Sequence, residues 1–135
     1  MRVVLGFVAC TLLLGATVRA QTAEQEYQGW MKSNNTVVAD LSKSLTAKDA
    51  KTAAADVKML RENLAKIMAY WQIRNVKDGV RFSLDGTYGF AQVGALASQG
   101  KFDEAAAAMK TAQANCGGCH MVHRERAADG TFKIK

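Results

Sequence analysis

The sequence predicts an all-α protein, an antiparallel up-down-up-down four-helix bundle. Proline is absent from all 135 residues. Alanine, lysine, leucine, glutamate, glutamine and methionine, which favour helices, are abundant. Apolar residues recur in steps of three and four along most of the chain, as they do on one face of a helix. The polar linkers between these stretches are short, which makes consecutive helices antiparallel neighbours. We therefore expect four helices and no strand.

The first twenty residues have the pattern of a cleaved signal peptide. Arg2 gives a positive start, residues 3–18 are an apolar run, and small residues precede the expected cleavage point. A retained membrane helix is the alternative, but the run is shorter than the roughly 20 residues that span a bilayer. A lipoprotein anchor at Cys10 is another alternative, but the run continues past this cysteine. We expect residues 1–20 to be removed during export to the periplasm and residues 21–135 to form one domain.

Four stripes of apolar residues predict the helices in order. They run from Tyr27 to Leu45, from Val57 to Trp71, from Asp78 to Ser98 and from Ala105 to His123. The linker before the second stripe ends in Asp49, a residue type that caps helix N-termini, and Thr46 is the other candidate cap.

The third stripe is the weakest of the four. Three glycines interrupt it, and each interior glycine costs about 1 kcal/mol relative to alanine. Either another helix or a cofactor packs closely against them, or Gly86 marks a kink. The side chains expected to face inward are Val80, Leu84, Ala91, Val93 and Leu96. After the fourth helix, the tail from about residue 128 is expected to be loosely held.

The distribution of charge along the chain excludes nucleic acids as partners. The formal charge is +6 and falls by two when Arg2 and Arg19 leave with the signal peptide. The basic residues are scattered along the chain instead of gathered in one stripe, so they do not form a nucleic-acid footprint. A mild positive excess suits solubility and attraction to an acidic partner.

The strongest chemical signal is Cys116-Gly117-Gly118-Cys119-His120. Two thiols at i and i+3 can each add to a haem vinyl group, and a histidine at i+4 lies on the same helical face and can reach the iron. The two glycines would leave room for the porphyrin edge. The motif therefore predicts one covalent haem c, held by Cys116 and Cys119, with His120 as an iron ligand.

Three other uses of these residues fit the sequence less well. A thioredoxin-like redox pair needs a βαβ context, which the chain lacks. A disulfide across so short a loop would strain a helix. A zinc site formed by Cys116, Cys119, His120 and His123 would draw all its ligands from one helix, whereas zinc sites usually recruit two segments.

With this motif near its C-terminus, the chain resembles class II cytochromes c, the family of cytochrome c′. Their signature is C-x-x-C-H-x-x-[aromatic]-Arg on the last helix of a four-helix bundle. Cys116, Cys119, His120 and Arg124 match it, while His123 stands where the family has an aromatic residue. The resemblance implies that Arg124 lies near the proximal face or a haem propionate. We expect His123 at the surface or the haem edge.

A second match lies in the first helix. Gly29-Trp30-Met31-Lys32 is similar to the G-x-M-K stretch of low-spin family members, in which the methionine binds iron. This implies that Met31 is the distal iron ligand, and Trp30 is a candidate for the haem pocket wall. Core packing is the alternative role for Met31, since methionine commonly fills cores. The competing methionines are Met59, Met68 and Met109.

These observations lead us to expect a periplasmic electron carrier with a His/Met-ligated haem, and not an enzyme. Its partner would be a periplasmic redox protein, with no nucleic acid and no membrane contact after signal cleavage. Family members are often dimers, so a homodimer is a candidate assembly. The first alternative is a five-coordinate haem protein that binds nitric oxide or carbon monoxide. The second is a metal-binding or structural helical bundle without haem.

Overall fold

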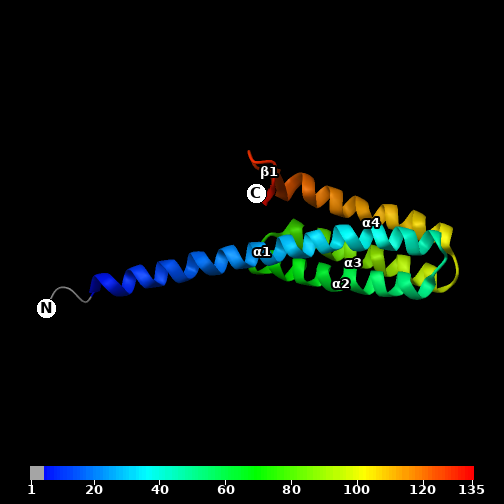
Figure 1. Cartoon of the computed structure of the whole chain (residues 1–135), viewed down its shortest axis with the longest axis horizontal. Helices are drawn as coiled ribbons and strands as arrows, with labels where there is room; N and C mark the ends of the chain where they lie inside the picture. The colour runs from blue at the N-terminus through cyan, green and yellow to red at the C-terminus, as the bar shows by residue number, and fades with distance from the viewer. Residues whose placement is uncertain (1–4) are drawn as a thin grey trace.

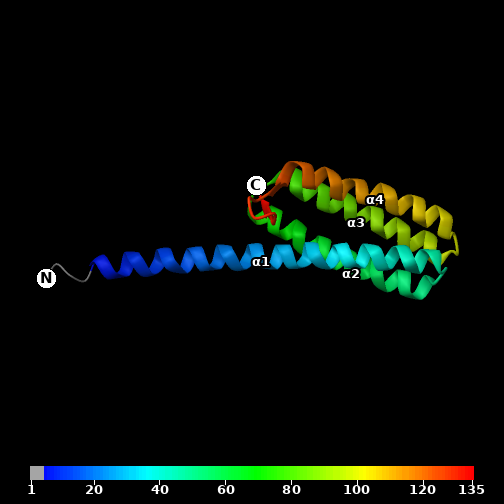
Figure 2. The same cartoon turned by 45° about the horizontal axis from the view of Figure 1, so that its top comes forward.

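Four helices form an up-and-down bundle (Figure 1). The computed structural model describes the backbone of residues 5–135 and the side chains of residues 23–135. Consecutive helices run in opposite directions, and the N-terminal part of α1 projects beyond the other helices (Figures 1 and 2). The four-helix fold and its antiparallel order are therefore confirmed. The helices are α1 (Leu5–Thr46), α2 (Ala50–Ile73), α3 (Lys77–Ser98) and α4 (Phe102–His123), and two strands follow, β1 (Arg124–Arg126) and β2 (Phe132–Ile134).

The predicted signal peptide, residues 1–20, lies outside the part of the chain whose side chains are described. Its cleavage therefore stays a prediction. Within the described part, no helix is both long and apolar enough to cross a membrane.

The short linkers end the helices through local backbone chemistry. Asp49 caps α2, because its carboxylate accepts a hydrogen bond from the Thr52 amide at 3.0 Å. Lys48 and Asn75 take up the left-handed conformation, with φ of 56° and 57°, in the turns before α2 and α3. Gly100, with φ of 75°, does the same before α4. These turns reverse the chain within a few residues and make sequential helices neighbours.

The core lies where the apolar stripes of α1 and α2 meet α3 and α4. Every residue of the predicted α2 stripe is buried: Val57, Leu60, Leu64, Ile67 and Trp71. In α1, Tyr27, Leu41 and Leu45 are buried as well. The largest fully buried side chains are Trp71, Phe90, Leu41, Leu60, Ile67 and Val93.

The inward face predicted for α3 is wrong in part. Leu84 is 38 % exposed, and of the predicted set only Val93 is buried. Small residues make up most of the face that packs inward, which consists of Gly79, Ser83, Gly86, Phe90, Val93 and Ala97. The helix continues through Gly86 without a break in its span from Lys77 to Ser98.

The glycines of α3 serve close packing. A Cβ placed on Gly89 would lie 2.8 Å from the Cβ of Ala112 on α4. One on Gly94 would lie 3.2 Å from Val57 on α2. Close approach of neighbouring helices at these glycines offsets the low helix propensity of glycine, because more atoms of the two helices come into van der Waals contact.

The expected loose tail is instead a β-hairpin, and the expectation of no strand is wrong. Strands β1 and β2 pair antiparallel, with Arg124 opposite Ile134 and Arg126 opposite Phe132. The turn is closed by a hydrogen bond from the Ala127 amide to the Thr131 carbonyl at 2.8 Å, and Gly130 has φ of 84°. The hairpin folds back on the end of α4, where the Lys135 amide donates to the His123 carbonyl at 3.1 Å.

Candidate functional site

A long opening separates α1 from α4. Helix α2 packs closely on α1 and on α3, and α3 packs closely on α4, but α1 and α4 make few contacts with each other. Figure 2 shows α1 and α4 diverging toward the end of the bundle where the hairpin lies. Cavities occupy this opening.

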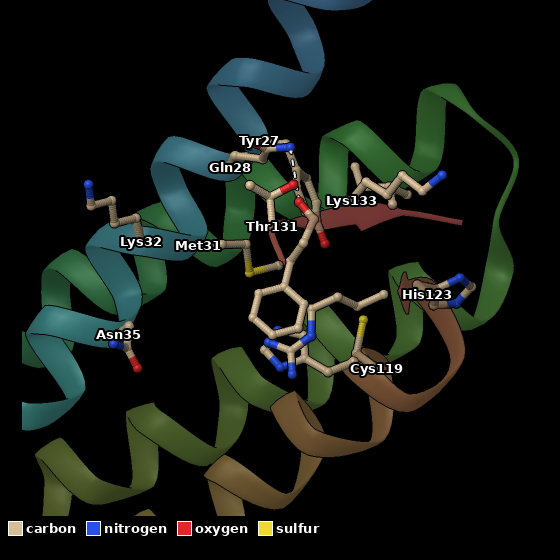
Figure 3. A pocket seen from close by; sticks show the side chains of 13 residues that line it. Tyr27, Gln28, Met31, Lys32, Asn35, Cys119, His123, Thr131 and Lys133 are labelled. Atoms are coloured by element: carbon tan, nitrogen blue, oxygen red, sulfur yellow. Dashed lines mark hydrogen bonds between the residues drawn. The ribbon is translucent and has the colours of Figure 1, made fainter. Parts of the chain in front are cut away.

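The cavity beside the Cys-x-x-Cys-His motif, called the main cavity below, lies between α1, the end of α4 and strand β2 (Figure 3). Its volume is about 500 Å³, within the range of ligand sites in proteins. An inner cavity of about 280 Å³ continues it toward α2 and α3. Met31, Asn35, Cys119 and His120 line both cavities, and the inner one is completed by residues that include Asn34, Leu64, Ile67, Phe82 and Cys116. Another cavity, of about 590 Å³, lies between α1 and the start of α4 and is lined by residues that include Met109.

The predicted haem ligands lie on opposite walls of these cavities. Met31 belongs to α1, whereas Cys116, Cys119 and His120 belong to α4. In Figure 3 the sulfur atoms of Met31 and Cys119 project into the same space from the two sides. The competing methionines lie elsewhere, since Met59 is 48 % exposed and neither Met68 nor Met109 lines the main or the inner cavity.

The two cysteines are free thiols in apolar surroundings. Cys119 is 7 % exposed and Cys116 is half-buried. Burial raises the pKa of Cys116, and burial together with the nearby Cys116 and Asp78 raises the pKa of Cys119 to about 11. Both groups are therefore neutral thiols at pH 7. Reactive redox cysteines have lowered pKa values, so this environment does not favour a thioredoxin-like role.

His120 stands on the same helical face as the two thiols. Burial lowers its pKa below the usual 6.5, and the positive charge of Arg124 lowers the pKa further. The imidazole is therefore neutral at pH 7, which is the state that binds metals.

His123 is a wall residue of the main cavity and not a surface side chain. Its side chain is 12 % exposed, and its Nε2 lies 3.0 Å from a carboxylate oxygen of Asp78. Its ring packs on Trp71 with 4.7 Å between centroids. The pKa of Asp78 is lowered, because His123 and the Gly79 amide outweigh the opposing effect of desolvation. These contacts hold the ring at the α3 side of the cavity.

The residues considered for zinc do not form a metal cluster. Within the described part of the chain, no group of three or more histidine, cysteine, aspartate or glutamate side chains is arranged to hold a metal ion. His123 is engaged by Asp78 and Trp71 instead.

Arg124 and Trp30 were both predicted to lie near the haem, and only one of them lines a cavity at the site. Arg124 lines the main cavity, and its guanidinium lies 4.1 Å from the centroid of the Phe132 ring. Trp30 packs half-buried against the core and lines neither the main nor the inner cavity. The structure therefore brings Arg124 to the site but not Trp30.

The glycines of the motif have different surroundings. A Cβ on Gly117 would meet nothing within 4 Å, which agrees with open space beside the motif. A Cβ on Gly118 would lie 2.9 Å from the ring of Phe82 on α3. Gly118 thus allows α3 to pack closely against the motif, a role that the sequence reasoning did not assign to it.

The hairpin is the part of the site that sequence reasoning missed. Residues 131–134 line the main cavity, and the Gln28 side-chain amide on α1 donates to the Phe132 carbonyl at 3.5 Å. The hairpin thus reaches from α4 to α1 across the end of the cavity. The pair Asp129-Gly130, a common turn signal, was the available clue.

The donor set and the cavity together fit a haem of the c type. The α4 wall offers two neutral thiols and one neutral imidazole, and the α1 wall offers a thioether. These are suitable groups for two thioether bonds and two axial ligands. Comparison of the chain with protein-family models, with curated proteins and with solved structures found no match.

Proposed function

We propose that this protein is a mono-haem c-type cytochrome that carries electrons. Cys116 and Cys119 would form the thioether bonds, His120 would bind iron on the proximal side, and Met31 on the distal side. The observation that carries the proposal is the pair of facing walls. One wall bears the thiols and the imidazole, and the other bears the thioether.

Two independent features support membership of the class II cytochromes c. The haem-attachment motif lies on the last helix of a four-helix bundle, as that family's signature requires. The methionine of the Gly29-Trp30-Met31-Lys32 stretch lines the main and the inner cavity, beside the motif, whereas Met59, Met68 and Met109 line neither of these two cavities. The second feature is what favours a low-spin carrier over a five-coordinate gas-binding protein.

When bound, the haem would supply a one-electron couple. The chain would supply the environment. Burial keeps the His120 imidazole neutral, and the thioether of Met31 is neutral as well, so both are ready to bind metal without losing a proton. The apolar side chains of Leu64, Ile67 and Phe82 would exclude water from the inner end of the site.

The cellular setting is part of the same proposal. We propose export through the signal peptide of residues 1–20, cleavage, and residence in the periplasm. A redox partner protein there would dock through a small, transient interface, as electron-transfer partners do.

An absorption spectrum of the purified protein tests the proposal. The full chain should be expressed in a bacterial host with the haem-attachment machinery, and oxidised and reduced spectra recorded with and without carbon monoxide. We expect a low-spin spectrum in both states and slow, weak binding of carbon monoxide, because Met31 occupies the distal position. A high-spin spectrum with ready carbon monoxide binding would favour the gas-binding alternative. A colourless protein would refute any haem function. Mass spectrometry of the same sample should show loss of residues 1–20.

A further inference from the structure

The rotation of α1 decides whether Met31 faces the cavity. A helix turns by about 100° per residue, so a shift of one residue would carry Met31 away from the α4 wall. Helix α1 makes few contacts with α4, whereas it packs closely on α2. Whatever fixes α1 in rotation must therefore lie mainly in the interface between α1 and α2.

Asn63 of α2 is the polar residue buried in that interface beside the cavity. It is 6 % exposed. Its side-chain amide donates to the Ser33 hydroxyl at 3.1 Å and to the Asn34 side-chain oxygen at 2.9 Å. A buried amide that loses its partners costs about 1–3 kcal/mol, so rotations of α1 that break these bonds are disfavoured. Buried polar residues fix the register of packed helices in the same way.

The partners of Asn63 lie directly beside the predicted ligand. Asn34 follows Met31 by three residues, so the two share a face of α1, and both line the inner cavity. Leu64, the residue after Asn63, lines the same cavity from α2. The hydrogen bonds of Asn63 therefore fix α1 at the turn that carries Met31.

We infer that Asn63 is a positioning residue, which holds α1 in the rotation that presents Met31 to the haem site. This inference rests on the proposed function. It adds a residue that lines neither the main nor the inner cavity and that no haem-binding pattern indicates.

The same helix pair provides a matched control. Ser44 on α1 is 6 % exposed, and its hydroxyl donates to a carboxylate oxygen of Asp56 on α2 at 2.9 Å. This is a second buried polar contact between α1 and α2, but it lies ten residues beyond Asn34, or about 15 Å along the helix. Its loss should weaken the interface without turning Met31.

The experiment compares holoprotein of the wild type, Asn63→Leu and Ser44→Ala. Carbon monoxide competes with Met31 for the iron, so its apparent affinity rises as the methionine is less often in place. We expect Asn63→Leu to raise the affinity of the reduced protein for carbon monoxide by about tenfold or more and to add high-spin character to the oxidised spectrum. Ser44→Ala should leave both measurements at wild-type values, although both variants lower the thermal midpoint. Wild-type values in Asn63→Leu would overturn the inference.

Two further measurements keep the test decisive. If Asn63→Leu does not fold, Ser33→Ala removes one of the two partners and should shift the affinity in the same direction by less, and an unchanged affinity would overturn the inference. In haem-free full-length protein, amide exchange around Met31 should rise in Asn63→Leu and not in Ser44→Ala. A high-spin wild type would refute the proposed function itself. A low-spin wild type with unchanged variants would refute only the role of Asn63.

Discussion

Replacing Met31 and Met109 one at a time distinguishes a methionine that binds iron from one that only packs in the core. Met31 lines both the main and the inner cavity and is half-buried. Met109 on α4 is 7 % exposed, belongs to the core and lines neither of these cavities. The account predicts that Met31→Ala changes the haem spectrum at little cost in stability, and that Met109→Ala does the opposite.

The magnitudes follow from burial. Burying a methionine fully is worth about 2 kcal/mol, so truncation of the half-buried Met31 should cost about 1 kcal/mol in the haem-free protein. Met109 is almost fully buried, and its truncation also leaves a cavity. The expected cost for Met109→Ala is about 2–5 kcal/mol. Met31→Ala, which costs less stability than Met109→Ala, should therefore be the variant that changes the coordination of the iron.

The assay has two parts. Urea unfolding of haem-free wild type and both variants gives the free energies of unfolding. Absorption spectra of the holoproteins, with and without carbon monoxide, give the coordination. Met31→Ala should lose the low-spin spectrum and bind carbon monoxide readily, while Met109→Ala keeps wild-type spectra. A low-spin spectrum in Met31→Ala would refute the assignment of Met31 and leave it as a packing residue.

Three further predictions test the helix packing, a helix cap and the hairpin beside the site. Gly89→Ala should destabilise the protein by up to about 2.5 kcal/mol, because about 1–3 kcal/mol of overpacking against α4 outweighs a gain of about 0.5–1 kcal/mol in helix propensity. Gly29→Ala, with nothing within 4 Å of the new Cβ, should stabilise the protein by about 0.5–1 kcal/mol in the same urea assay. Asp49→Ala should lower the thermal midpoint at pH 7. The carboxylate accepts hydrogen bonds from Thr52 that lower its pKa below 3.8, so its contribution is present above that pH and is lost as the pH falls through the folded value. A difference between wild type and variant that does not shrink as the pH is lowered below 3.8 would contradict this. Deletion of residues 127–135 should speed alkylation of Cys119 in haem-free protein by at least about tenfold, since a buried thiol reacts only when it is exposed, and an unchanged rate would show that the hairpin does not cover the cavity.

Large apolar side chains made α1 and α2 predictable. Their stripes face the core as the 3.6-residue period requires, and Leu41, Leu60 and Trp71 are fully buried. The period was less informative for α3, because its buried face is built mainly from glycine, serine and alanine. Such residues give little hydrophobic signal, and their burial depends on how closely α4 and α2 approach.

The tail was mispredicted for a different reason. Each strand of the hairpin has three residues, and β1 is the charged run Arg124–Arg126. So short a strand has no visible alternation, and pairing depends on contacts with α4 and α1. The turn signal Asp129-Gly130 marked where the chain reverses, but the strands themselves had no pattern of their own.

The candidate site was predictable where its parts are adjacent in sequence. Cys116, Cys119 and His120 share a helical face by spacing alone. The approach of Met31 from another helix came from a family resemblance, and its place in the cavity depends on the rotation of α1. Asn63 lay beyond prediction, since an asparagine in a helix carries no sign of the partners it will have across an interface.

Covalent attachment of the pigment is the most direct test of the central claim. Holoprotein made in a competent host should be extracted with acidified organic solvent, and the protein fraction measured by intact mass spectrometry. We predict that the protein keeps the mass of one haem and that the double variant Cys116→Ser, Cys119→Ser loses it to the solvent. Release of the pigment from the wild type would contradict the claim.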